Sequence, residues 1–95
     1  MDKIKKLSQA IRLGATFRPQ CTGEFSDSVG TCALGAAMEA VGLEPKMCYY
    51  KELRRRFPVL GNSYWSFTLA GKITRLNDNG QTREQIADWL EAQGL

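Results

Sequence analysis

The sequence predicts an all-α fold in which about five short helices surround one core, as a single domain over residues 1–95. Apolar residues recur at steps of three and four in five separate segments, which is the spacing of one face of an α-helix. Glycine or proline follows most of these segments and marks where a helix ends. A chain of 95 residues can bury roughly two thirds of its unfolded surface, so one modest core is sufficient.

The first predicted helix spans residues 3–13, with Ile4, Leu7 and Ile11 on its apolar face and Gly14 as its stop. Residues 17–30 then lack a sustained period and contain several turn-forming residues, so they are interpreted as a loop. We expect Phe17 and Phe25 to be tucked under the fold. A minor extended pair is predicted near residues 21–25.

The second predicted helix follows Thr31, a residue type that commonly caps helices, and ends at Gly42. Glu39 lies on the side expected to face water. Small residues flank the apolar face, so neighbouring elements can approach closely, and we interpret this helix as central. Its predicted buried face consists of Leu34, Ala37, Met38 and Val41.

The third predicted helix spans residues 47–57, places Tyr50, Leu53 and Phe57 on one stripe, and stops at Pro58. Its charged residues point away from that stripe.

The fourth helix is expected to begin at Asn62 or Ser63, and residues 77–80 are predicted to form a turn after it. The apolar face of this helix comprises Trp65, Leu69, Ile73 and Leu76, widened by Phe67 and Ala70.

The last helix opens with a capping box, in which Thr82 is followed three residues later by Gln85, and Gly94 closes it. The side chains expected to point inward are Ile86, Trp89, Leu90 and Gln93.

Composition excludes several kinds of chemistry. The chain contains no histidine, which rules out Ser-His-Asp and Cys-His catalysis and any zinc site with histidine ligands. Its three cysteines, Cys21, Cys32 and Cys48, have irregular spacing that fits neither a disulfide framework nor paired zinc ligands, even with Asp27 or Glu24 as a fourth ligand. We therefore expect no metal, no cofactor and no catalytic residues.

Cys32 is a candidate reactive thiol because it lies in the first turn of the second helix, where the helix dipole can stabilise a thiolate. The alternative is a structural role, since free cysteine is among the most buried residue types. We favour the structural role. Asn77 and Asp78 pose a similar choice between ligand binding and bonding to nearby backbone amides, and there too we favour structure.

Nucleic-acid binding is the main alternative suggested by charge. The net charge is +3, and the candidate contacts are divided between the first and third helices: Lys5, Lys6, Arg12, Arg54, Arg55 and Arg56. Residues 73–95 resemble a helix-turn-helix in outline. However, the last helix would turn Glu84, Asp88 and Glu91 toward phosphates with only Arg83 in compensation, so we do not favour this interpretation.

The chain resembles a group of small uncharacterised bacterial and phage-associated proteins. The resemblance rests on residues 7–15 with Arg18-Pro19-Gln20, on the Cys-Ala-Leu-Gly-Ala-Ala block at residues 32–37, and on residues 76–78 followed by residues 82–89. It implies a shared fold and adds no mechanism.

No segment approaches the roughly 20 apolar residues needed to cross a bilayer, and the N-terminus lacks a secretory signal pattern. We therefore expect a soluble cytoplasmic protein. Elimination favours a non-enzymatic protein that binds another protein in a regulatory or phage-related setting, with nucleic-acid binding as the alternative. An exposed apolar patch around Tyr49, Tyr64 or Leu13 is one place where a partner would dock.

Overall fold

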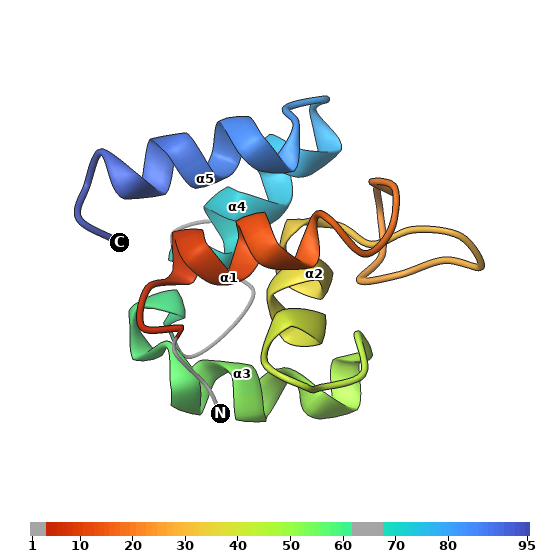
Figure 1. Cartoon of the computed structure of the whole chain (residues 1–95), viewed down its shortest axis with the longest axis horizontal. Coiled ribbons are helices and arrows are strands. Elements are labelled where there is room, and N and C mark those ends of the chain that lie inside the picture. Colours follow the sequence, from red (N-terminus) through yellow and green to blue (C-terminus); the bar gives the residue numbers. More distant parts are fainter. Residues whose placement is uncertain (1–3, 62–67) are drawn as a thin grey trace.

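The computed structural model describes residues 4–61 and 68–95, and within these ranges the protein is all-α, as predicted. The five α-helices there are α1 (Leu7–Gly14), α2 (Ala33–Ala40), α3 (Tyr50–Arg56), α4 (Leu69–Asp78) and α5 (Arg83–Glu91). Two short 3₁₀ helices, η1 (Met47–Tyr49) and η2 (Pro58–Leu60), flank α3. In Figure 1, α5 lies along one side of the molecule, α3 along the opposite side, and α1 crosses between them.

All five α-helices contribute to one buried apolar cluster. Helix α1 packs against α2, and Leu7, Ile11, Leu34 and Met38 of these helices belong to the cluster and are fully buried or nearly so. Because α2 is buried along residues 33–38 and contacts α1, α3 and α4, its predicted central position is confirmed.

Two glycines allow unusually close packing around α2. A Cβ atom at Gly14 would lie 1.8 Å from the carbonyl oxygen of Ala36, and one at Gly35 would lie 2.0 Å from the carbonyl oxygen of Phe25. Neither position has room for a larger residue without a backbone shift. The backbones of α1 and of the following loop therefore pack directly against α2.

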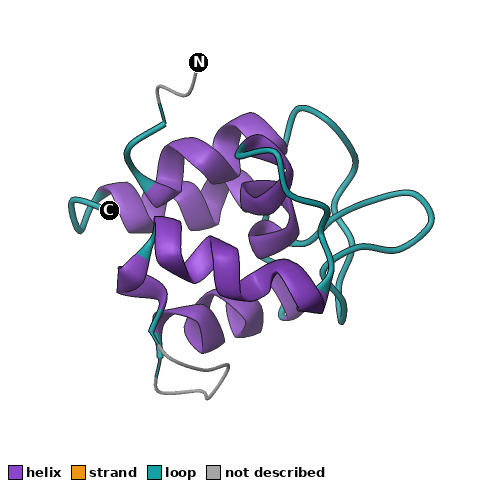
Figure 2. Ribbon diagram, turned by 90° about the horizontal axis from the view of Figure 1, so that it is seen from below, coloured by secondary structure: helices purple, strands orange, loops and turns teal. Residues whose placement is uncertain are grey.

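The loop between α1 and α2 projects from one end of the helical body (Figure 2). It contains two isolated bridges, Gln20 with Thr31 and Ser26 with Thr31, so its extended pairing lies just outside the predicted residues 21–25. Phe25 packs partly buried against the core, as expected. The prediction for Phe17 was wrong, since this side chain is 51% exposed. Phe17 directly follows the C-terminal turn of α1, where the chain turns outward.

Several boundaries differ from the predictions because side chains other than the expected ones cap the helices. Helix α1 starts at Leu7 and not at residue 3. Just before it, the backbone N–H groups of Lys5 and Lys6 donate to the Gln9 side-chain oxygen. Helix α2 is capped by Cys32 rather than Thr31, since the Cys32 Sγ accepts the Gly35 N–H. Predicted residues 47–57 divide into η1 and α3, with Tyr50, Leu53 and Phe57 buried as expected.

The fourth helix begins at Leu69 behind Thr68, whose hydroxyl accepts the Gly71 N–H. The expected caps Asn62 and Ser63, together with Tyr64, Trp65 and Phe67, lie outside the described residues. Residues 77 and 78, predicted to begin a turn, form the last turn of α4. The Asn77 side chain bonds to the backbone of other segments, at Ala33 and Cys21, and not to the backbone of a turn.

The capping box of Thr82 and Gln85 at the start of α5 is confirmed. Ile86 and Leu90 are buried as predicted, and Trp89 is partly buried. Gln93 was wrongly placed inward and is exposed, because the helix ends at Glu91 before it can carry Gln93 to the core face.

Candidate functional site

Asn77 is fully buried and is the centre of a group of hydrogen bonds. Its Oδ1 accepts the Ala33 N–H at 3.1 Å, and its Nδ2 donates to the carbonyl oxygen of Cys21 at 2.9 Å. The same Oδ1 accepts from Gln20 Nε2 at 2.9 Å. The Ala33 amide is one of the unpaired donors at the start of α2, so Asn77 links α4 to α2 and to the loop. A bond from this residue to backbone amides was predicted, but for the helix that follows it, α5, and not for α2.

Arg83 occupies the opposite side of this group. Its side chain is buried, and its guanidinium donates to Thr31 Oγ1 at 3.0 Å and to the Arg18 carbonyl at 2.6 Å, with a longer bond to the Ala15 carbonyl at 3.4 Å. The Arg83 N–H is in turn accepted by Gln20 Oε1. Burial lowers the pKa of this guanidinium.

We call Gln20, Thr31, Asn77 and Arg83 the polar cluster. Its members come from both ends of the loop and from α4 and α5. The side chains of Gln20, Asn77 and Arg83 bond to backbone groups, and Thr31 Oγ1 accepts from the Arg83 guanidinium. Arg83 is therefore not available to contact phosphates, as a helix-turn-helix would require. The polar cluster fixes the loop on the helical body.

Cys32 lies at the edge of the polar cluster and is 6% exposed. Burial raises the pKa of its thiol to about 11, although the Gly35 and Leu34 amides act in the opposite direction. A nucleophilic thiol needs a lowered pKa and access to solvent, and Cys32 has neither. The structural role favoured from the sequence agrees with this geometry.

The cysteines and carboxylates are spread through the fold. Cys21, Cys32 and Cys48 are all free thiols, and only Cys48 is exposed. Within residues 4–61 and 68–95, no three side chains of the types His, Cys, Asp and Glu lie close enough together to hold a metal ion. Nor does any helix in these ranges have the length and apolar character needed to cross a membrane.

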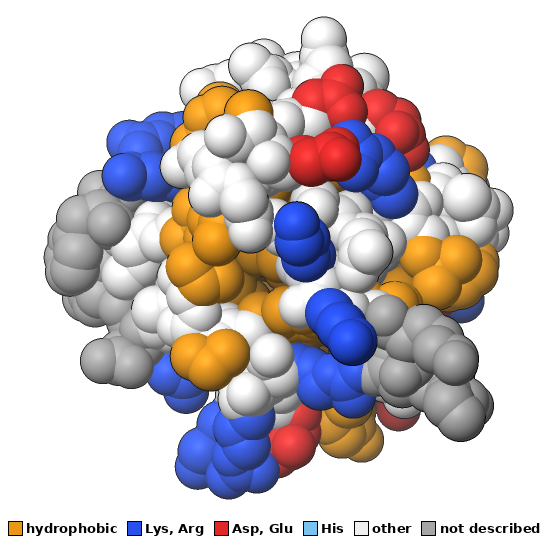
Figure 3. Space-filling view, turned by 60° about the vertical axis from the view of Figure 1, so that its left-hand side comes forward, with side chains coloured by type: hydrophobic (Ala, Val, Ile, Leu, Met, Phe, Trp, Pro, Cys, Tyr) orange, Lys and Arg blue, Asp and Glu red, His pale blue; other side chains and the backbone are white. Residues whose placement is uncertain are grey.

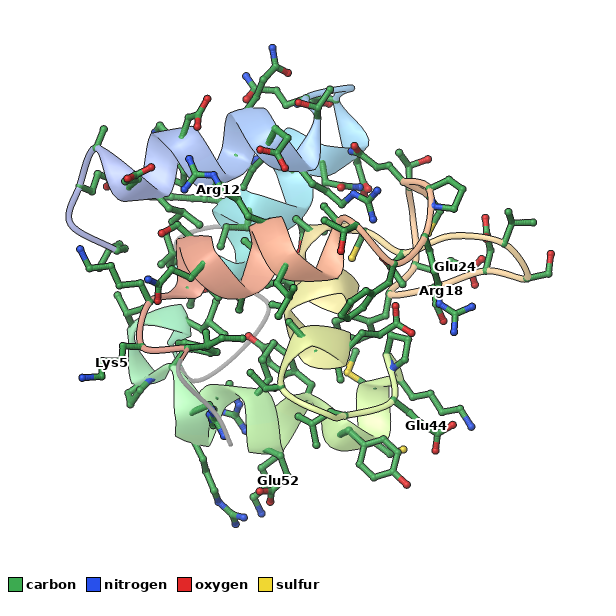
Figure 4. All side chains as sticks on the ribbon, in the orientation of Figure 1. Lys5, Arg12, Arg18, Glu24, Glu44 and Glu52 are labelled. Atoms are coloured by element: carbon green, nitrogen blue, oxygen red, sulfur yellow. The ribbon has the colours of Figure 1, made fainter. Side chains whose placement is uncertain are left out.

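Arg12, one of the candidate nucleic-acid contacts, is paired with carboxylates of α5. It forms ion pairs with Asp88, with Glu91 at 2.7 Å and with Glu84 at 3.7 Å, and Figure 4 shows it reaching from α1 toward that helix. Hydrogen bonds to Asp88, which contributes most, and to Glu91 raise the pKa of Arg12. Its charge is therefore neutralised within the protein.

Glu39 was predicted to face water, and this prediction was wrong. Its side chain is only 13% exposed and accepts a hydrogen bond from Arg18 Nε at 2.8 Å. The loop folds back over α2 at this point and covers the carboxylate. Two of the three consecutive arginines of α3 also have partners within that helix. Arg54 lies over the Tyr50 ring at 5.5 Å, and Arg55 pairs with Glu52.

The remaining candidates meet at one place. Lys5, Lys6 and Arg56 line a groove of about 170 Å³ between the start of α1, the end of α3 and the end of α5. Figure 3 shows basic side chains beside a hydrophobic hollow on this face. We call this the basic groove, and its other described lining residues are Leu7, Phe57, Pro58, Val59, Gly94 and Leu95. None of its described lining side chains is acidic.

The apolar part of the basic groove was not predicted. Val59 is 43% exposed, although it belongs to an apolar sequence that was interpreted only as the stop of a helix. A run of three arginines followed directly by Phe-Pro-Val-Leu is a pattern that could have indicated an amphipathic surface. Leu13 and Tyr49, proposed as patch residues, are 42% and 38% exposed and lie outside this groove.

Comparison of the chain with protein-family models, with curated proteins and with solved structures gave no match. Its own side chains are therefore the basis for inferring what it binds.

Proposed function

We propose that this protein binds another protein through the basic groove, and that the partner supplies an acidic segment with one apolar anchor side chain. The single observation that carries this proposal is the meeting of Lys5, Lys6 and Arg56, from two separate parts of the chain, around one apolar depression. Complementary charge guides association, whereas a buried apolar anchor supplies most of the affinity.

The size of the groove favours an anchor over a whole small molecule. Its volume of about 170 Å³ is below the range of about 300–1,000 Å³ that is typical of ligand pockets. Pro58 and Val59 form an exposed apolar wall, which is the kind of surface that an inserted side chain covers.

Nucleic acid is a weaker candidate for the same surface. Of the six basic residues considered, Arg12 and Arg55 are paired with carboxylates and Arg54 lies against Tyr50. The groove has three basic side chains in its described lining, so it could contact at most about three phosphates, which predicts weak binding that depends strongly on salt.

We further propose that the protein acts in the cytoplasm and is not an enzyme. Support for the compartment comes from the three free thiols, one of them exposed, which suit a reducing environment.

The test uses a short fluorescein-labelled peptide of alternating Glu and Ala with one central Phe, followed by fluorescence anisotropy. Two further probes are the same peptide with Phe replaced by Ala and a single-stranded DNA of equal length. We expect the Phe peptide to bind, the Ala peptide to bind at least about tenfold more weakly, and added salt to weaken both.

Matched variants locate the binding. The double variant Lys5→Glu, Lys6→Glu and the variant Val59→Asp should each weaken binding about tenfold or more. Lys51→Glu combined with Lys72→Glu changes the net charge equally at exposed positions outside the groove, and it should leave binding almost unchanged. Equal losses in both double variants would reject the groove, and tighter binding of the DNA than of either peptide would favour the nucleic-acid alternative.

A further inference from the structure

Two of the three cysteines are brought together at the base of the loop between α1 and α2, where the loop leaves the helical body (Figure 2). Gln20 and Thr31 form a parallel bridge there. In this bridge the Thr31 N–H donates to the Pro19 carbonyl at 2.9 Å, and the Thr31 carbonyl accepts the Cys21 N–H at 3.0 Å. Segments paired in this way lie about 4.7–4.9 Å apart. Cys21 and Cys32 are the next residues on the two segments.

The two thiols lie on the same side of this bridge. The side chains of Gln20 and Thr31 both accept hydrogen bonds from Arg83, so they share one face. Successive side chains of an extended backbone point to opposite faces, and the backbone of Cys32 is extended, with φ −79° and ψ −177°. The side chains of Cys21 and Cys32 therefore lie together on the face opposite Arg83.

The Asn77 side chain limits how far the two segments separate beyond the bridge. Its Nδ2 lies 2.9 Å from the Cys21 carbonyl oxygen and its Oδ1 lies 3.1 Å from the Ala33 nitrogen, so one amide group fills the gap. This spacing is consistent with the separation of about 4.4–6.8 Å between Cα atoms that a disulfide requires. Arg83 interacts electrostatically with both thiols, which independently places them in one neighbourhood.

A small solute has a route to this pair. Cys32 is 6% exposed and borders a cavity of about 310 Å³ under the loop, whose other walls include Phe25 of the loop and Thr74 and Asp78 of α4. Burial raises the pKa of both thiols, so the reactive thiolate is scarce at neutral pH and oxidation is slow. A small oxidant at sustained concentration is therefore needed.

We propose that Cys21 and Cys32 are a redox-sensitive pair, which a peroxide converts into a disulfide that locks the base of the loop. The Cys32 thiolate attacks one oxygen of hydrogen peroxide, the O–O bond breaks, and a sulfenic acid forms while the leaving hydroxide takes up the thiol proton as water. Cys21 Sγ then attacks Cys32 Sγ. The S–S bond forms, the S–O bond breaks, and the hydroxide leaves with the Cys21 proton as a second water. Two thiols thus lose two electrons to one peroxide molecule. This pair is independent of the basic groove.

The experiment exposes the reduced chain to hydrogen peroxide under native conditions and then labels the remaining thiols with N-ethylmaleimide in urea. The variant Cys48→Ser is used throughout, because the exposed Cys48 would otherwise link two molecules. Trypsin leaves both cysteines in one fragment, residues 13–46, since Arg18 is followed by proline. We expect mass spectrometry to show this fragment unlabelled and lighter by two hydrogens.

The effect on stability supplies a second measurement. A disulfide closes residues 21–32 into a covalent loop and restricts the unfolded chain. The oxidised protein should therefore unfold at a higher urea concentration than the reduced protein, and dithiothreitol should reverse the shift. Cys21→Ser and Cys32→Ser, each in the Cys48→Ser background, remove one partner and should show no disulfide and no such increase with peroxide. If Cys32→Ser does not fold, Cys21→Ser serves alone.

Three outcomes would overturn the proposal. The first is a fragment 13–46 that carries two maleimide labels after prolonged exposure to peroxide. The second is a disulfide that forms only when peroxide is added in urea, which would show that the thiols are not adjacent in the folded protein. The third is an oxidised protein whose urea midpoint is unchanged or lower, which would show that the bond does not fit the native loop.

Discussion

The polar cluster and the basic groove use similar residue types for opposite purposes. In the polar cluster, Asn77 is fully buried and Arg83 nearly so, and their partners are mainly backbone groups at distances of 2.6–3.4 Å. In the basic groove, Lys5, Lys6 and Arg56 are exposed around an apolar wall. Burial with partners makes a polar residue part of the fold, whereas a basic surface attracts an acidic partner.

The largest effect on stability is expected from Asn77→Leu. This change leaves the Ala33 N–H and the Cys21 carbonyl buried without partners, and it frees Gln20 Nε2 from one of its two bonds. We expect a loss of about 4 kcal/mol in the free energy of unfolding, measured by urea denaturation.

Asn79→Ala is the matched control for Asn77→Leu. Asn79 is exposed just beyond the end of α4, so its replacement should change the free energy of unfolding by less than about 0.5 kcal/mol. Similar losses in the two variants would show that the polar cluster does not dominate local stability.

A somewhat smaller loss is expected for Arg83→Met, which keeps the apolar stem and removes the donors to Thr31 and Arg18. Its acceptors are mainly backbone carbonyls that remain in place, so the free energy of unfolding should fall by about 2–3 kcal/mol. Thermal unfolding followed by circular dichroism measures this. A more stable variant would mean that desolvation of the guanidinium outweighs its hydrogen bonds.

Stability should fall as pH rises from about 9 to 11 because of Cys32. Burial raises the pKa of this thiol from the ordinary value of 9.0 to about 11, so the neutral form is favoured by folding. This contribution is fully present below pH 9 and is lost as the pH rises through about 11. The difference corresponds to about 2–3 kcal/mol. Cys32→Ser keeps a capping oxygen and does not ionise in this range, so urea denaturation of this variant should show a flatter pH profile. An identical profile would contradict the prediction.

The smallest effect on stability is expected at the basic groove. Lys5→Glu combined with Lys6→Glu alters exposed side chains, so the free energy of unfolding should change by less than about 0.5 kcal/mol per residue. The same variant should abolish most peptide binding, which separates it from Asn77→Leu. A large loss in the free energy of unfolding, measured by urea denaturation, would show that these lysines stabilise the fold.

Much of the fold could be predicted because local patterns carry it. The steps of three and four among Leu7, Ile11, Leu34 and Met38 mark helix faces that are buried in the structure, and the capping box at Thr82 marks the start of α5. Helix boundaries were less predictable where distant residues act on a helix end. Asn77 lies in the last turn of α4, and its side chain bonds to the Ala33 and Cys21 backbone, which lie more than 40 residues away in the sequence.

The candidate site could be predicted only in part. Charge alone identified Lys5, Lys6 and Arg56, but it identified Arg12 equally, and only the packing of α1 on α5 pairs Arg12 with three carboxylates. From the sequence, Arg83 was considered only as the one cation that the last helix would offer to phosphates in a helix-turn-helix. No local pattern shows that the loop carbonyls of Ala15 and Arg18 surround it.

The sequence by itself determined the helical class, the apolar faces and the absence of histidine chemistry, because these depend on residue type and on spacing within one segment. Only the tertiary structure decided which polar residues are buried, which cations are neutralised, and that Thr74, Asp78 and Phe25 border one cavity. Contacts of this kind join residues far apart along the chain, and their energies depend on burial and geometry that local periodicity does not encode.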